Sequence, residues 1–132
     1  MLILTASFEG KPADNARHFV EWLENVKGAN AFAGVSFGVF GCGNHDWVQT
    51  YQRIPTLVDR VLEEHGATRL VERGEGDAAS AGFFEAFEQW ERGMWEKLAE
   101  VCAPRRGASQ ANPHDKRSST APLDSQKRAS WR

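Results

Sequence analysis

Residues 35–47, with the sequence V-S-F-G-V-F-G-C-G-N-H-D-W, predict the fold more directly than any other part of the chain. They pass from a short apolar run into a glycine-rich turn, and residues 52–65 then carry apolar side chains at helical spacing. Residues 2–10, L-I-L-T-A-S-F-E-G, show the same order ahead of another amphipathic segment. Each stretch therefore predicts a strand, a turn and a helix. In an open parallel sheet such turns lie together at the carboxyl edge of the strands, where ligands bind.

The other elements follow from the same periodicity. We expect strands at residues 2–6, 35–40 and 67–73, helices at residues 15–26, 52–65 and 83–101, and a loop at residues 74–77. Asp14 should cap the first helix, and Gly66 should end the second. Each helix has one apolar face, made of Phe19, Val20, Leu23 and Val26, of Ile54, Leu57, Val58, Val61 and Leu62, and of Phe83, Phe87, Trp90, Met94, Leu98 and Val101. The order β-α-β-α-β-α predicts a three-layer α/β/α fold with a parallel sheet.

Charge divides the chain into two parts. Residues 1–102 hold 16 acidic against 9 basic side chains, a balance of −7, whereas residues 103–132 hold 2 against 7, a balance of +5. The second part lacks apolar periodicity and is rich in Pro, Ser and Arg, so we expect one folded domain at residues 1–102 and a disordered basic tail at residues 103–132. An acidic domain is unsuited to nucleic-acid backbones.

Several protein classes are excluded by composition. The two cysteines, Cys42 and Cys102, do not make a disulfide framework, and residues 1–4 are too short for a secretory signal. No apolar run approaches the length of a membrane span. These features indicate a reduced, cytoplasmic protein.

The two predicted turns share one chemical property. Each places an aromatic residue, Phe8 or Trp47, among small residues that leave the peptide groups accessible. Two rings and bare peptide groups at one sheet edge can hold a flat heteroaromatic cofactor. The alternative is that both rings are ordinary core residues.

Other interpretations of the glycine-rich turn have less support. Cys42, His45 and Asp46 could suggest a metal or a thiol nucleophile, but they lack a fourth ligand and a paired motif. The turn is not a dinucleotide fingerprint, because Asp46 stands where G-x-G-x-x-G requires its last glycine. We expect no metal and no catalytic side chain. Trp90, Met94 and Trp95 are predicted to pack in a helix interface.

Longer motifs resemble one known family. T-A-S-F-E-G-K-P-A-D-N-A (residues 5–16), H-F-V-E-W-L (residues 18–23) and V-F-G-C-G-N-H-D-W-V-Q-T-Y-Q (residues 39–52) are similar to the flavodoxin-like FMN domain of diflavin reductases. G-A-T and R-G-E-G-D-A (residues 66–68 and 73–78) extend the similarity to about residue 101. The closest resemblance is to the reductase part of fused bacterial and fungal cytochrome P450 monooxygenases.

The resemblance implies an FMN site with the isoalloxazine ring between Phe8 and Trp47. The implied cofactor-binding residues are Ser7, Phe8, Glu9, Gly10, Cys42, Gly43, Asn44, Trp47, Thr50, Tyr51 and Gln52. In such a family the flavin takes electrons from an FAD/NADPH-binding module and passes them to a haem domain. The acidic residues Glu9, Asp14, Asp46, Glu75 and Asp77 would disfavour negative charge on the reduced flavin.

The chain departs from the family in three ways. Phe8 stands where close relatives have Tyr, the first strand with its phosphate-binding loop has no counterpart, and no FAD- or NADPH-binding region follows residue 101. We therefore expect an incomplete flavodoxin-like domain, a truncated FMN electron-transfer module of an NADPH–haemoprotein reductase system that is not active as an enzyme alone. The alternative is a non-catalytic α/β fragment without cofactor, either inert or complemented by another chain.

Overall fold

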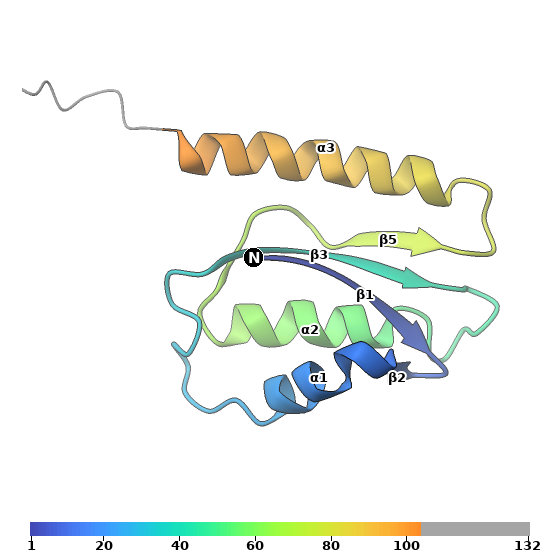
Figure 1. The fold of residues 1–132 in the computed structure, drawn as a ribbon, viewed down its shortest axis with the longest axis horizontal. Helices are drawn as coiled ribbons and strands as arrows, with labels where there is room; N and C mark the ends of the chain where they lie inside the picture. The colour runs from blue at the N-terminus through green and yellow to red at the C-terminus, as the bar shows by residue number, and fades with distance from the viewer. Residues whose placement is uncertain (104–132) are drawn as a thin grey trace, which may run out of the picture.

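The computed structural model describes residues 1–103. Its elements are β1 (Leu2–Phe8), β2 (Lys11–Pro12), the 3-10 helix η1 (Asp14–Ala16), α1 (Arg17–Glu24), β3 (Ser36–Gly43), α2 (Arg53–Glu64), β4 (Thr68–Arg69), β5 (Gly74–Asp77) and α3 (Phe83–Cys102). Figure 1 shows α3 on one face of the sheet and α1 and α2 on the other. The three-layer architecture is therefore confirmed. The predicted tail lies outside the described residues, apart from residue 103.

β3 is the central strand of the sheet. It runs parallel to β1 on one side and to β4 and β5 on the other. The short strand β2 pairs antiparallel with the end of β1. Glu9 and Gly10 join these two strands with positive φ angles of 49° and 75°, the backbone pattern of a tight two-residue hairpin turn.

The third strand differs from the prediction. Only Thr68 and Arg69 of residues 67–73 pair as a strand, and the expected loop at residues 74–77 is instead β5, parallel to the carboxyl half of β3. The glycines make this pairing possible beneath α3. A Cβ atom on Gly74 would overlap Phe40 and lie 2.6 Å from Trp90 Cδ1, and one on Gly76 would lie 2.5 Å from Phe83 Cε2. A Gly-rich strand thus marks a close approach of backbone to aromatic side chains.

The first helix also differs from the prediction. It begins as the 3-10 turn η1, and α1 ends at Glu24. Asp14 lies inside η1, and no side chain caps either helical segment, so the predicted Asp14 cap is wrong. The end of the second helix is as predicted, because Gly66 follows the C-cap of α2 with a φ of 93°.

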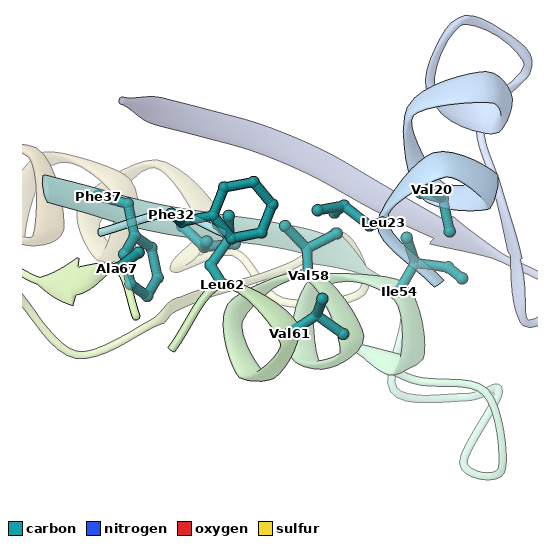
Figure 2. Packing of buried hydrophobic residues seen from close by; sticks show 10 residues of the cluster. Val20, Leu23, Phe32, Phe37, Ile54, Val58, Val61, Leu62 and Ala67 are labelled. Atoms are coloured by element: carbon teal, nitrogen blue, oxygen red, sulfur yellow. The ribbon is translucent and has the colours of Figure 1, made fainter. Parts of the chain in front are cut away.

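Two hydrophobic clusters lie on opposite faces of the sheet. The larger, drawn in Figure 2, joins α1 and α2 to one face of β3 and contains Val20, Leu23, Phe32, Phe37, Val39, Ile54, Val58, Val61, Leu62 and Ala67. The smaller joins α3 to the other face through Phe40, Trp90 and Met94. The apolar face predicted for α3 is wrong at the end of the helix, because Val101 is 58% exposed. The prediction that Trp95 packs in a helix interface is also wrong, because its side chain is exposed.

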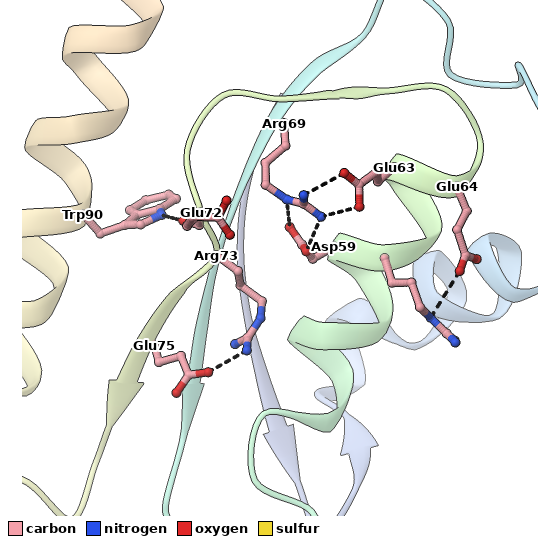
Figure 3. Close-up of polar contacts among 9 residues, drawn as sticks. Asp59, Glu63, Glu64, Arg69, Glu72, Arg73, Glu75 and Trp90 are labelled. Atoms are coloured by element: carbon pink, nitrogen blue, oxygen red, sulfur yellow. Dashed lines mark hydrogen bonds and ion pairs between the residues drawn. The ribbon is translucent and has the colours of Figure 1, made fainter.

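Hydrogen bonds and ion pairs hold β4 and the segment that connects it to β5, as Figure 3 shows. Arg69 donates two hydrogen bonds to Asp59, at 2.7 and 3.0 Å, and two to Glu63, at 2.8 and 2.9 Å. Trp90 Nε1 donates to the carbonyl oxygen of Glu72 at 3.1 Å. The segment is therefore tied to α2 on one face and to α3 on the other.

Candidate functional site

The two stretches predicted as turns meet at the carboxyl edge of the sheet, but both predicted strands were too short. β1 continues to Phe8 and β3 to Gly43, so the first residues of each predicted turn are the ends of strands. Ala6 is in register with Cys42, so β1 and β3 end side by side. Ser7 Oγ donates a hydrogen bond to the carbonyl oxygen of Thr50 at 2.8 Å, which ties the first turn to the second. A hollow of about 330 Å³ lies between the turns and is lined by Ala6, Ser7, Phe8, Glu9, Cys42, Gly43, Asn44, Trp47, Thr50, Tyr51 and Ala78.

Nine of the eleven predicted cofactor-binding residues line this hollow. The sequence interpretation missed Ala6, which it placed inside the strand. It also missed Ala78, which follows β5, because that strand was predicted to be a loop.

Phe8 and Trp47 stand out from the surface around the hollow. Their exposed fractions are 71% and 58%, so neither belongs to a hydrophobic cluster. Burial of a large aromatic ring in the core is favourable, so such rings are usually buried. Large rings that are exposed beside a concave surface are typical of a binding site. The alternative that both are ordinary core residues is therefore wrong.

Gly10 and Gln52 lie elsewhere. Gly10 forms the hairpin turn and lines a different groove. Gln52 is only 3% exposed, because its backbone is left-handed, with a φ of 57°, and its side chain points beneath the turn. Its Nε2 donates to the carbonyl oxygen of Gly41 at 2.9 Å, and its Oε1 accepts from Arg73 at 2.9 Å. Gln52 therefore supports the turn from below.

The groove that Gly10 lines has a volume of about 680 Å³, larger than the hollow, and lies between β2, η1, α1 and α2. Its walls carry charged residues such as Lys11, Asp14 and Arg53 over aliphatic side chains, and none of its lining residues within 1–103 is aromatic. A flat heteroaromatic ring would find no stacking partner there, so the smaller hollow is the better candidate despite its size.

Neither metal nor thiol chemistry finds support in the described part of the chain. Residues 1–103 contain no group of three side chains placed to hold a metal ion. Burial raises the pKa of the Cys42 thiol, which keeps it protonated, and the ring of His45 pairs with Asp77 and Asp46. Burial is also the main cause that raises the pKa of Tyr51. Cys42 and Tyr51 both line the hollow, and their side chains are thus uncharged at neutral pH.

Residues 1–90 match the family model described as Flavodoxin. The chain belongs to the flavodoxin family. Among solved structures, a cysteine-to-serine variant of flavodoxin from Pseudomonas aeruginosa aligns with a TM-score of 0.62 at 20% identity, covering 74% of this chain and 65% of that one. A short-chain flavodoxin associated with a bacterial microcompartment aligns with a TM-score of 0.54 at 16% identity, covering 72% and 63%. These two likenesses concern the fold alone.

Sequence relatives of this flavodoxin-family chain are parts of much longer proteins. It is 59% identical over 100 residues to a self-sufficient cytochrome P450 monooxygenase from Phanerodontia chrysosporium, covering 76% of this chain and 9% of the relative. It is 50% identical over 95 residues to a bifunctional cytochrome P450/NADPH–P450 reductase from Bacillus cereus, covering 72% and 9%. The chain thus spans about 9% of the length of these relatives. Among the described residues, α3 and the shorter helices are too polar or too short to cross a bilayer.

Proposed function

We propose that the hollow between Phe8 and Trp47 holds the isoalloxazine ring of FMN, and that the chain carries this flavin as an electron-transfer module. Flavodoxin domains bind FMN. The observation that carries the proposal is the pair of exposed rings that line one hollow together with small residues. When bound, the flavin supplies the redox chemistry, because it accepts and donates single electrons.

The side chains of the hollow then bind and orient the ring. Phe8 and Trp47 stack on its faces and exclude water, while Gly43 and Ala78 let peptide groups approach its polar edge. Among the described residues that line the hollow, Glu9 is the one charged residue, and none is basic. The hollow is therefore suited to the ring, and the described lining offers no cation for the phosphate.

The proposed electron partners follow from the relatives. Their names join a cytochrome P450 to an NADPH–P450 reductase, so we assign the chain an FAD/NADPH-binding module as donor and a haem domain as acceptor. We also place it in the cytoplasm, since Cys42 and Cys102 are both free thiols.

A titration of the 132-residue chain with FMN and with riboflavin tests the ring assignment. Because the hollow contacts the ring and not the phosphate, we expect similar, weak affinities for the two flavins. Trp47→Ala should weaken both by about 1–2 kcal/mol, through loss of stacking. Cys42→Ser, which keeps the shape of the lining, should change little. An unchanged affinity in the Trp47 variant would remove the stacking assignment.

A second candidate function is a fragment completed by another chain. One observation favours it, because Leu2 and Leu4 are 45% and 55% exposed on the sheet face that α3 leaves open beside Phe40. Contiguous exposed apolar side chains next to an unpaired strand edge are typical of an interaction surface. In this case flavin would bind only after the partner chain is added.

A further inference from the structure

One carboxylate ties together two turns at the carboxyl edge of the sheet. Asp77 ends β5, and its Oδ1 accepts hydrogen bonds from the backbone N–H of His45, at 3.1 Å, and of Ala79, also at 3.1 Å. Its Oδ2 contacts Nδ1 of the His45 ring. His45 lies in the turn after β3, so backbone and side chain of one residue are both held by the end of β5.

Trp47 depends on this turn for its position. Its backbone N–H donates to the carbonyl oxygen of Asn44 at 3.1 Å, and its ring is 58% exposed. Other hydrogen bonds also anchor the turn. Ala78 N donates to the Gly43 carbonyl oxygen at 2.7 Å, Ser7 Oγ donates to Thr50 at its far end, and Gln52 Nε2 donates to the Gly41 carbonyl oxygen beneath it. Of these anchors, only the contact of His45 with Asp77 can titrate near neutral pH.

We propose that His45, held by Asp77, is a positioning residue for Trp47, and that its protonation state sets how firmly the flavin-facing turn is held. The proposal rests on the proposed function for its flavin consequence, whereas the coupling of His45 to Trp47 stands by itself. His45 does not touch the hollow, so it acts through the turn.

In the described part of the chain, the two charged groups that face His45 are acidic. Asp77 faces it from the end of β5, and Asp46, whose Oδ1 is 3.6 Å from Nε2, faces it from the same turn. The hydrogen bond that His45 donates to Asp77, and then the charge of that carboxylate, raise the pKa of His45 above the ordinary value. Partial burial alone would raise the pKa of Asp77, but its hydrogen bonds with His45 and Ala79 outweigh this effect and lower it.

The sign of the pH dependence follows. Because the pKa of His45 is raised, the imidazolium form holds the pair at pH 6, and the pair weakens as the pH rises through that raised pKa. A neutral ring can still donate from Nδ1, so the contact weakens without breaking. We expect FMN affinity to fall about two- to fivefold between pH 6 and pH 9, the range typical of exposed ion pairs.

The first experiment needs no flavin. In the 132-residue chain, NMR should show that the ring of His45 titrates above the ordinary pKa of histidine. His18, an exposed histidine of α1 whose ring lies 3.6 Å from Glu21, supplies the matched control variant. The indole N–H signal of Trp47 should shift with the same midpoint as His45. His45→Gln should remove that step, and the matched variant His18→Gln should keep it. A Trp47 signal that ignores the titration of His45 would overturn the proposal.

The second experiment measures FMN affinity from pH 6 to pH 9. His45→Gln should give low affinity at every pH, since the cation is lost, and His45→Lys should give high affinity at every pH, since the cation is kept. A retained pH dependence in either variant contradicts the positioning role. If no variant binds FMN at all, the proposed function fails, while the NMR titration still decides the coupling.

Discussion

A methyl group added at Gly41 would collide with Gln52 and Pro55, which lie beneath the turn after β3. A Cβ atom there would overlap Oε1 of Gln52 and lie 2.5 Å from Cβ of Pro55. The amide of Gln52 can move, but Pro55 is fully buried at the start of α2 and cannot. We expect Gly41→Ala to lower the free energy of unfolding by about 1–3 kcal/mol, the usual cost of overpacking, as measured by urea denaturation.

Gly93 provides the matched control at the same scale. It lies inside α3, and a Cβ atom there would meet nothing within 4 Å. Gly93→Ala should raise the free energy of unfolding by about 0.5–1 kcal/mol, because alanine favours the helix. If the two substitutions changed the free energy of unfolding by the same amount and in the same direction, crowding at Gly41 would not be the cause of the change.

Among the elements, α2 and β4 are joined chiefly by Arg69. Its guanidinium is about 20% exposed and donates to both Asp59 and Glu63. Arg69→Ala should lower the free energy of unfolding by about 1–3 kcal/mol, since it leaves the mostly buried carboxylate of Asp59 unpaired. Arg60→Ala is the control, because Arg60 is 61% exposed and lies 3.9 Å from Glu64; we expect less than about 0.5 kcal/mol. Similar losses in both variants would contradict a special role for Arg69.

Across the whole molecule, the free edge of β1 predicts self-association. Within the described residues 1–103, residues 2–6 of β1 pair with β3 alone, and Leu4 is 55% exposed on the open face. Such an edge is a template for pairing with another chain. We expect the 132-residue chain to self-associate in sedimentation velocity and Leu4→Lys to suppress this association. Val48→Lys adds the same charge to an exposed turn residue and should leave association unchanged. A wild-type chain that stays monomeric at high concentration would refute the prediction.

The parts that were predictable from sequence are those fixed by local chemistry. The place of Phe8 and Trp47 at the carboxyl edge of the sheet was predictable, because a preceding apolar run and small residues mark the end of a strand, although Phe8 is the last residue of β1 and not a turn residue. β5 was missed because G-E-G-D has low strand propensity, and the packing of Phe40 and Trp90 against its two glycines is what makes a strand favourable there. Gln52 was predicted to touch a ligand, and its left-handed backbone, which its neighbours in the fold impose, turns it inward instead. Long-range contacts decide both cases, and no short pattern encodes them.

The position of β3 between two hydrophobic clusters has a consequence for how the molecule opens. Phe37 and Val39 of β3 belong to one cluster and Phe40 to the other. Separation of α1 and α2, or of α3, from the sheet would therefore expose one face of the same strand. Amide protons of β3 can therefore exchange with deuterium only when both layers come apart, and they should exchange at the rate of global unfolding. The two-residue strands β2 and β4 have no such protection and should exchange through local fraying. Despite its two separate clusters, the molecule should melt as one cooperative unit whose last protected protons lie in its central strand.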